Sequence, residues 1–421
     1  MEAGRPQLVV VSSIVPWRHS TSGFAGRVHH FVSAARDSMN VAWIWIRLPH
    51  QVGAPNGSII SPSRTLDAPL APWLERTWRS RLRRWLVQYP FGRLPSDIYP
   101  RDWSGLRNAL TEARPSVVAF YLPYLAYFAD HAPIGVPVVG VLEEGWERHL
   151  AERLVSSSSH RSRWAWACVA RREATRYARV YRRVNRRASA VVAISVAEKE
   201  WLSRNIDADK IAVVPHGIDL SYFAPLDSEQ LDTDVLVVGD LSAARNYEGA
   251  LRTWELARSA PESVSWRWSF VGPIDPGAAS TLVGGAARVT GVVDDVRPYY
   301  RRTRAVLVPA LSGTGVKTTS IQAWATRRPL VASRIGARGL PVQPEENVLI
   351  GDNPQQLVHQ LHRALADQSL ADRLATNGRL TAEQHCDLSV LAHRFVDLCR
   401  FAAGDRTVAT QDDIGNRMRG G

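Results

Sequence analysis

The residues with the clearest chemistry lie in the stretch VPALSGTGVKTTSIQAWA, residues 308–325. A turn of small residues with Gly313 and Gly315 separates an apolar run from a predicted helix at Lys317–Thr326. The backbone N–H groups of residues 313–316 would then lie at a helix start, where unpaired donors and partial positive charge gather. Lys317 adds a full charge. This arrangement predicts an anion site, with a plain tight turn beside a solvated lysine as the alternative.

Two other loops combine glycine, polar and basic residues directly after an apolar run. The first, SSIVPWRHSTSGFAGR, spans residues 12–27, and the second, GDLSAARN, spans residues 239–246. Ligands of open parallel sheets bind at the carboxyl ends of the strands. If the apolar runs are such strands, all three loops lie on the rim of one cleft.

Apolar, β-branched runs alternate with helical stretches along the chain, in two series. Runs that are apolar throughout are typical of parallel strands buried on both faces, and the β-α-β-α order predicts doubly wound sheets. We therefore predict an α/β fold with two Rossmann-like domains facing each other across a cleft, and helices such as Gly26–Arg36 and Leu357–Leu365 between the strands. The predicted strands are Leu8–Ser12, Val41–Ile46, Val117–Tyr121, Val136–Leu142, Ala190–Ser195 and Ile211–Val214, then Val235–Gly239, Trp266–Gly272, Val289–Thr290, Ala305–Pro309 and Leu330–Ala332.

The composition excludes several classes of protein. The 421 residues carry a formal net charge of +12, almost all of it from arginine, because only Lys199, Lys210 and Lys317 are lysines. Abundant Arg, Ala, Trp and Pro with scarce Lys is typical of a GC-rich bacterial genome, so the charge does not argue for nucleic-acid binding. The three cysteines form no ligand pair or disulfide framework, which favours a reducing cytosol. No uncharged apolar run reaches 18 residues, so we predict no membrane-spanning helix.

Several stretches resemble, in order, the C-terminal half of a GT-B glycosyltransferase of the large retaining family 4. The resemblance runs from about Arg187 to Leu365, and His216 stands where the family usually has Asn. The matching stretches are VVAISVAEKEWL (191–202), IAVVPHGIDLSYFAP (211–225), VLVVGDLSAARN (235–246) and the segment 289–340 that contains the glycine turn.

The resemblance implies an enzyme that transfers a sugar, of the hexosyltransferase kind (EC 2.4), from a nucleotide sugar to an acceptor with retention of configuration. In such a front-face displacement, the departing diphosphate helps to deprotonate the acceptor. The resemblance also implies the domains: an acceptor-binding domain at 1–214, a nucleotide-sugar-binding domain at 215–385, and a helix at 386–403 that returns to the first domain. A polar, Gly-rich tail follows at 404–421.

The family's donor site can be carried over position by position. The glycine turn would hold the donor diphosphate through backbone amides, and Lys317 and Arg245 would offset the charge that develops on it. Gln322 replaces a Glu that accepts hydrogen bonds from the ribose, so it keeps an acceptor oxygen and loses the charge. Gly23 resembles a glycine that approaches the donor phosphates. The predicted donor-binding residues are Gly23, Gly239, Arg245, Asn246, Gly313, Thr314, Gly315, Val316, Lys317 and Gln322.

The N-terminal half matches the family in outline. Phe120 and Tyr121 stand where members often carry a His, and Glu143–Glu144 stands in place of a His-Asp pair. We take Glu144 as the match of the Asp, and as a catalytic candidate with Arg245 and Lys317. Solvated turn glutamates and surface histidines are the alternatives. The predicted acceptor-binding residues are His19, Tyr121, Tyr124 and Glu143.

No metal and no cofactor besides the nucleotide-sugar co-substrate is expected. VDDV, residues 293–296, only superficially suggests a metal-binding DxD motif, because Asp295 is better interpreted as a helix N-cap. GT-B enzymes generally need no catalytic metal, since the helix end and the cations do its work.

Two basic stretches, residues 72–90 and 161–187, combine apolar residues at helical spacing with many arginines. Such helices can lie on an anionic membrane surface. We prefer amphipathic helices that pack on their own domain with an arginine-rich outer face. The prediction is therefore a cytoplasmic protein without a nucleic-acid partner, and peripheral contact with the inner face of the membrane is the alternative.

Two other functions stay open. Gln322 and the missing His also suit a GT-B protein that binds a nucleotide sugar without transferring it, and the same fold serves enzymes such as nucleotide-sugar epimerases. The sequence does not specify the base, the sugar or the acceptor. Polysaccharide or lipid-linked sugars and small natural products are the acceptor classes considered.

Overall fold

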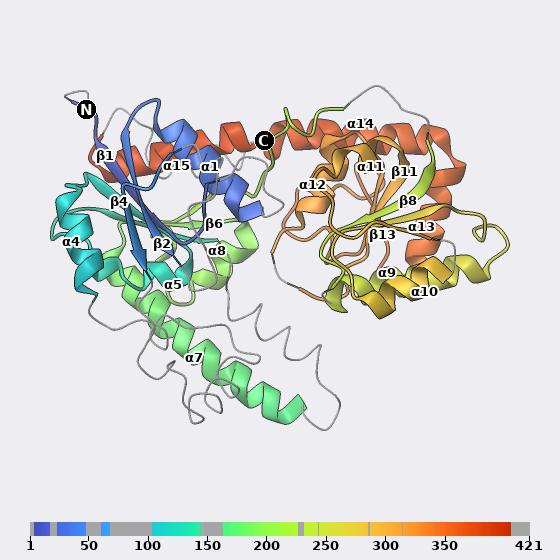
Figure 1. Cartoon of the computed structure of the whole chain (residues 1–421), viewed down its shortest axis with the longest axis horizontal. Coiled ribbons are helices and arrows are strands. Elements are labelled where there is room, and N and C mark those ends of the chain that lie inside the picture. Colours follow the sequence, from blue (N-terminus) through green and yellow to red (C-terminus); the bar gives the residue numbers. More distant parts are fainter. Residues whose placement is uncertain are drawn as a thin grey trace. The chain divides into compact units, whose positions relative to one another are not determined.

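The computed structural model divides the chain into two compact units, unit 1 of residues 1–215 with 388–421 and unit 2 of residues 216–387 (Figure 1). The structure describes residues 4–16, 23–47, 60–67, 103–143, 145, 163–225, 231–242, 244–284, 287–313 and 315–405, and the statements below refer to these.

Unit 1 contains a sheet of seven parallel strands in the order β3-β2-β1-β4-β5-β6-β7. Along β1, Val9 and Val11 face one core of the unit and Leu8 and Val10 face the other, as expected for a strand buried on both sides. The strands are β1 (Gln7–Ser12), β2 (Asn40–Arg47), β3 (Arg64–Asp67), β4 (Val117–Tyr121), β5 (Val138–Glu143), β6 (Ala190–Ala193) and β7 (Ile211–Val213).

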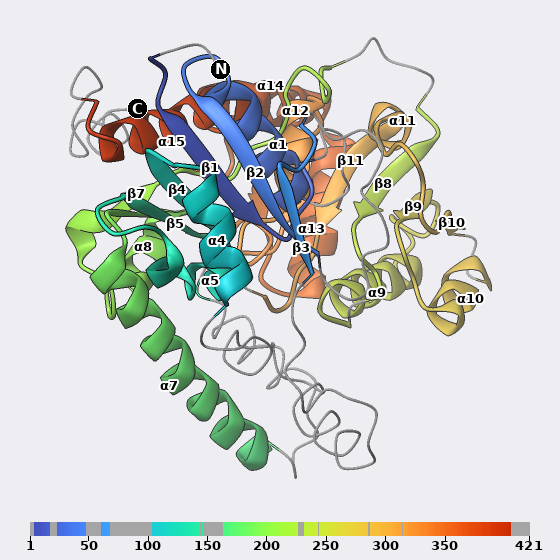
Figure 2. The ribbon, with the colours of Figure 1, turned by 60° about the vertical axis from the view of Figure 1, so that its left-hand side comes forward.

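Helices cover both faces of this sheet (Figure 2). One core contains side chains of α4, α5 and α7, and the other contains side chains of α1 and α15. Helix α15 is the segment in which the chain returns to unit 1 from unit 2. The helices are α1 (Gly23–Ala35), α4 (Ser104–Glu112), α5 (Pro123–Ala126), α7 (Arg163–Arg187), α8 (Val196–Leu202) and α15 (Leu388–Ala402), with short 3-10 turns at Ala129–His131 and Ala208–Lys210.

The basic helix α7 packs on unit 1 through its C-terminal half. Tyr177, Tyr181 and Val184 belong to the core, whereas Arg182 and Arg186 are exposed. The C-terminal half of the stretch 161–187 thus has the amphipathic packing that we preferred, and the side chains of residues 161–170 lie outside the described residues. Residues 72–90, the other basic stretch, lie outside the described residues. Among the described helices, none combines the length and the apolar character needed to cross a membrane.

Unit 2 contains a sheet of six parallel strands in the order β10-β9-β8-β11-β12-β13. Helices α9, α10 and α13 contribute to the core on one face, α11 and α12 to the core on the other, and α14 contributes to both. The strands are β8 (Thr233–Val238), β9 (Trp268–Val271), β10 (Arg288–Val289), β11 (Thr303–Val308), β12 (Leu330–Ala332) and β13 (Leu349–Ile350). The helices are α9 (Ala244–Ser259), α10 (Pro276–Gly284), α11 (Arg297–Arg301), α12 (Thr318–Ala325), α13 (Pro354–Ala366) and α14 (Gln368–His385).

Candidate functional site

The strand order of unit 2 reverses between β8 and β11. From β8 the sheet grows through β9 to β10 on one side, and β11, β12 and β13 follow on the other. Open parallel sheets bind ligands outside the carboxyl ends of the strands at such a switch point. The loop that begins at Gly239 and the turn that follows β11 both leave the sheet there. They are two of the three loops that the sequence predicts.

The turn after β11 depends on glycine and ends in a helix start without a side-chain cap. Gly313 and Gly315 have φ values of 124° and 73°, which other residues adopt only with strain. Lys317 is the N-cap residue of α12 and makes no side-chain capping hydrogen bond. Lysine has no acceptor atom, so it cannot cap the first N–H groups of a helix as Ser or Asp would. An anion would complete this helix start and would also meet the lysine charge.

Arg338 holds this turn from a neighbouring loop, and the sequence analysis missed it. Its Nη1 donates to the backbone oxygen of Gly313 at 3.0 Å. The residue follows β12 and therefore lies at the carboxyl end of the next strand of the sheet. Position after a predicted strand is the one sequence signal that could have identified it.

Helix α9 approaches the same turn closely because Gly249 has no side chain. A Cβ atom at Gly249 would lie 2.0 Å from the backbone oxygen of Pro309, the residue after β11. The first turn of α9 contains Arg245 and Asn246, and Asn246 Nδ2 donates to the backbone oxygen of Asp240 at 2.8 Å. The Arg245 side chain lies outside the described residues, and so does Thr314.

The end of β8 is also packed backbone against backbone. Gly239 has a φ of 147°, and a Cβ atom on Gly272 would lie 1.9 Å from the Gly239 oxygen. No side chain at these two positions covers the carboxyl edge of the sheet. The predicted donor-binding glycine at residue 239 is partly buried, and its N–H donates to the Val271 oxygen at 3.0 Å.

Gln322 lies in α12 and is partly buried. Its Oε1 accepts a hydrogen bond from the Tyr300 hydroxyl at 2.9 Å. Burial raises the pKa of Tyr300 far above its usual value, so the phenol stays protonated and remains a donor. One lone pair of the Gln322 oxygen is therefore used inside unit 2, which leaves its second lone pair and the amide N–H groups for other partners.

The predicted residues of unit 1 fall into two groups. His19 and Glu144 lie outside the described residues, as does the side chain of Tyr124, and Gly23 is the first residue of α1. Tyr121 and Glu143 are described, with exposed fractions of 1% and 0%. Both therefore lie inside unit 1 rather than on its surface.

A buried ion pair explains the position of Glu143. Arg27 of α1, which the sequence analysis did not select, donates from Nε to Glu143 Oε1 at 3.0 Å, and both side chains are fully buried. Two residues further on, the backbone N–H of Gly145 donates to Glu198 Oε2 at 2.8 Å. The two described residues that flank residue 144 are thus each tied to a helix, Glu143 to α1 and Gly145 to α8.

Asp295 belongs to a local ion pair. It precedes Val296, the N-cap residue of α11, so the N-cap lies one residue later than predicted. Its Oδ1 accepts from the backbone N–H of Arg297 at 2.9 Å. Burial opposes ionisation of Asp295, but the hydrogen bonds from Arg297 outweigh it and lower the pKa of the carboxyl group. Among the described residues, no group of three or more His, Cys, Asp or Glu side chains could hold a metal ion.

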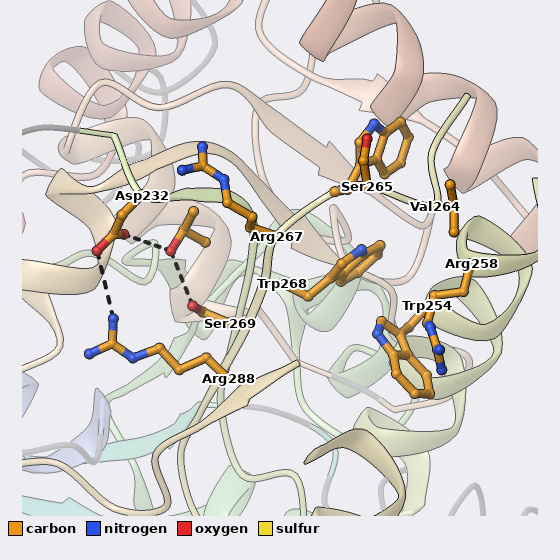
Figure 3. Close-up of a pocket in the computed structure, with 11 residues that line it drawn as sticks. Asp232, Trp254, Arg258, Val264, Ser265, Arg267, Trp268, Ser269 and Arg288 are labelled. Atoms are coloured by element: carbon orange, nitrogen blue, oxygen red, sulfur yellow. Dashed lines mark hydrogen bonds and ion pairs between the residues drawn. The ribbon is translucent and has the colours of Figure 1, made fainter. Parts of the chain in front are cut away.

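A separate hollow of about 320 Å³ lies at the amino ends of β8, β9 and β10, away from the switch point (Figure 3). Its arginines already have partners within unit 2. Arg267 donates to Asp234 at 3.0 and 3.1 Å, and Arg288 lies 3.7 Å from Asp232. Arg258 lies over an indole ring, 4.9 Å from its centroid. The hollow therefore lies apart from the switch point, and its arginines are engaged inside unit 2.

Comparison with protein families gives two matches on this chain. A model described as "Glycosyl transferases group 1" matches residues 232–367, and a model described as "Glycosyltransferase Family 4" matches residues 58–222. Together they cover most of the chain, and each lies largely in one unit. No curated protein matches significantly.

Solved structures of similar fold cover nearly the whole chain. Sucrose-phosphate synthase from Thermosynechococcus elongatus superposes with a TM-score of 0.67 at 17% identity, over 95% of this chain and 100% of that one. Anabaena HepE, solved with UDP and also with UDP-glucose, gives 0.62 at 13% identity in its UDP complex, over 93% and 99%. The lipopolysaccharide outer core galactosyltransferase WaaB gives 0.58 at 14% identity, over 93% and 99%. The predicted fold of two Rossmann-like domains is confirmed.

Proposed function

Because the chain belongs to the group 1 glycosyltransferases and has the GT-B fold, we propose that it moves a sugar from a nucleotide-sugar donor to an acceptor with retention of configuration. The observation that carries the proposal is the glycine turn that ends at Lys317 at the switch point of unit 2. This turn presents backbone amides and a cation where the fold binds its ligands.

In the proposed reaction, the donor diphosphate lies on the turn at residues 313–316. Lys317 and Arg245 offset the negative charge that grows on the diphosphate as the bond to the sugar breaks. Gln322 faces the ribose with the hydrogen-bonding capacity that Tyr300 leaves. The helix start and the two cations supply positive charge at the leaving group, so we propose that transfer needs no metal ion and survives chelation by EDTA.

The acceptor is assigned to unit 1, with Glu144 as the group that contacts its reacting hydroxyl. UDP-glucose is the first donor to test, since HepE, which shares the fold, has been solved with it. The acceptor class is a polysaccharide or lipid-linked sugar, or a small natural product.

The test begins with a thermal-shift screen of UDP-, GDP-, ADP- and TDP-sugars on the whole protein. The sugar that stabilises the protein most is then incubated with and without acceptors, and the products are followed by NMR, which reports the anomeric configuration. Retained configuration in a transferred sugar supports the proposal. Binding without transfer or hydrolysis indicates a binding protein, and epimerised free nucleotide sugar indicates an epimerase. If no nucleotide sugar stabilises the protein, the proposal fails.

A further inference from the structure

Arg27 lies wholly inside unit 1 and uses its guanidinium in several directions. Nε donates to Glu143 Oε1 at 3.0 Å, and the group lies over the Phe31 ring, 4.7 Å from its centroid. Nη1 donates to the backbone oxygen of Pro215 at 2.5 Å, and Nη2 to that of Val214 at 2.6 Å. One side chain thus joins α1, the carboxyl end of β5 and the segment after β7.

These contacts lie where the chain leaves unit 1 and where it returns. Val214–Pro215 are the residues of unit 1 that directly precede the crossing into unit 2. Phe31 follows Arg27 by one helical turn, on the same face of α1, and stacks on Phe395 of α15 with centroids 4.3 Å apart and an interplanar angle of 9°. Helix α15 is the returning segment, and α1 and α15 lie against each other in Figures 1 and 2. Helix α1 therefore contacts both the segment Val214–Pro215, where the chain leaves unit 1, and helix α15, where it returns.

The arrangement is costly, which argues against stability as its main purpose. Glu143 has a φ of 67°, in the left-handed region that is unfavourable for a residue with a side chain. Among the described residues, its Oε2 and the Tyr121 hydroxyl are buried without a hydrogen bond of normal geometry, and burial beside the Glu143 carboxylate raises the pKa of Tyr121. Apolar residues of similar volume often replace a buried ion pair without loss of stability. Strain of this kind persists where the surrounding structure enforces it, and it clusters at functional sites.

We propose that Arg27 and Glu143 are positioning residues for sugar transfer, and that their ion pair holds the carboxyl end of β5 and the crossing at Val214–Pro215 in one fixed arrangement. This inference rests on the proposed function. The loop after β5 carries Glu144, the predicted acceptor contact, and small displacements of such groups lower turnover strongly. Apart from Gly23 at the start of α1, the predicted donor-binding residues lie in unit 2, so loss of the pair should reduce turnover far more than donor affinity.

The first experiment measures backbone hydrogen exchange around the crossing, in a peptide that covers residues 211–220. The test variant is Arg27→Met/Glu143→Leu, which replaces both charges with apolar side chains and so avoids an unpaired buried charge. The control is Arg187→Met, because Arg187 Nη2 also donates to backbone oxygens of unit 1, those of Pro133 and Val136 at 3.0 and 2.9 Å. We expect exchange near the crossing to rise about tenfold in the double variant and to stay unchanged in the control.

The second experiment separates turnover from binding, with the nucleotide sugar that most raises the melting temperature of the wild type in the screen above. We expect the double variant to lower kcat by about 10–100-fold and to leave the calorimetric Kd for that sugar within about twofold of the wild type, well below the effect of one hydrogen bond. Glu143→Gln keeps the acceptor oxygen for Arg27, and should retain more turnover than the double variant.

Unchanged exchange and unchanged kcat in the double variant would overturn the inference. Equal losses in Arg187→Met would also overturn it, because the effect would then belong to any arginine that binds backbone oxygens. If the wild type transfers none of the sugars, the proposed function fails on its own. Hydrogen exchange would still decide in that case whether the pair holds the crossing.

Discussion

The carboxyl edges of the two sheets occupy the same position in their units and are built in opposite ways. In unit 1, two charged side chains, Arg27 and Glu143, form an ion pair in the interior. In unit 2, glycines with positive φ at 239, 313 and 315 shape the backbone of the edge, and Lys317 is the N-cap residue of α12. The edge of unit 1 therefore pairs its own charges, whereas the edge of unit 2 combines a glycine turn, a helix start and a lysine, which together suit an anion. Equivalent positions in similar folds need not have similar roles.

The largest effect is expected from breaking the Arg27–Glu143 ion pair at the edge of unit 1. Arg27→Met leaves the Glu143 carboxylate buried without its cation, and should reduce the free energy of unfolding by about 3–5 kcal/mol. Urea denaturation followed by circular dichroism measures this loss. Arg187→Met serves as the control, since it removes an arginine of the same unit without leaving a buried carboxylate. A loss no larger than in that control would mean that Glu143 is solvated or protonated.

At the edge of unit 2, Lys317→Ala should weaken binding of the identified nucleotide sugar by about 1.5–3 kcal/mol, the scale of a hydrogen bond to a charged group. The melting temperature without ligand should not change. Calorimetric titration measures the affinity, and Lys199→Ala in α8 controls for the loss of one positive charge elsewhere. Unchanged affinity, with Lys317 more than about 10 Å from any bound phosphate, would show that the glycine turn does not bind the diphosphate. At that distance, near the Debye length, direct contact is excluded and charge is largely screened.

The close approach of α9 to the glycine turn gives a third prediction. Gly249→Ala places a Cβ atom 2.0 Å from the Pro309 oxygen, so the backbone must shift. We expect a loss of about 1–3 kcal/mol in the free energy of unfolding, the usual cost of overpacking, together with weaker donor binding. Gly284→Ala at the end of α10 is the matched control, because a Cβ there meets nothing within 4 Å. Equal stability of the two variants would contradict the packing argument.

The smallest effect is expected at Gln322. Gln322→Glu preserves an oxygen that accepts from Tyr300 and adds a charge suited to ribose hydroxyls, so donor affinity should stay equal or rise by up to about 1 kcal/mol. The same titration measures it, with and without Tyr300→Phe. Weaker binding in Gln322→Glu would place this side chain near the phosphates rather than the ribose.

The strands that the sequence predicted best are those buried on both faces. Continuous apolar runs identified the inner strands of both sheets, and β4 and β12 have the predicted bounds. No predicted strand corresponds to β3 or β13, which lie at sheet edges. Strand β3 has the sequence RTLD, with Leu66 as its one apolar residue, and β13 has two residues. Such short or polar edge strands carry no apolar run for a pattern to detect.

The glycine turn was readable from sequence and the buried ion pair was not. Glycine spacing before a helix is a local signal, so the turn at residues 313–317 could be located without knowing its neighbours. Arg27 and Glu143 are 116 positions apart, and their burial depends on how α1 packs over the end of β5. Glu143 was therefore predicted to contact the acceptor, with a solvated turn glutamate as the alternative.

The return of α15 to unit 1 affects the order in which the protein can fold during synthesis. Unit 2 is a continuous segment, whereas the core of unit 1 includes Leu391, Phe395 and Leu398, which the ribosome adds after all of unit 2. The nascent chain must therefore carry an incomplete unit 1, with the apolar face of α1 unpaired, while unit 2 already has every residue it needs. Chaperones that bind exposed apolar surface would meet the N-terminal part of the chain first and release it last.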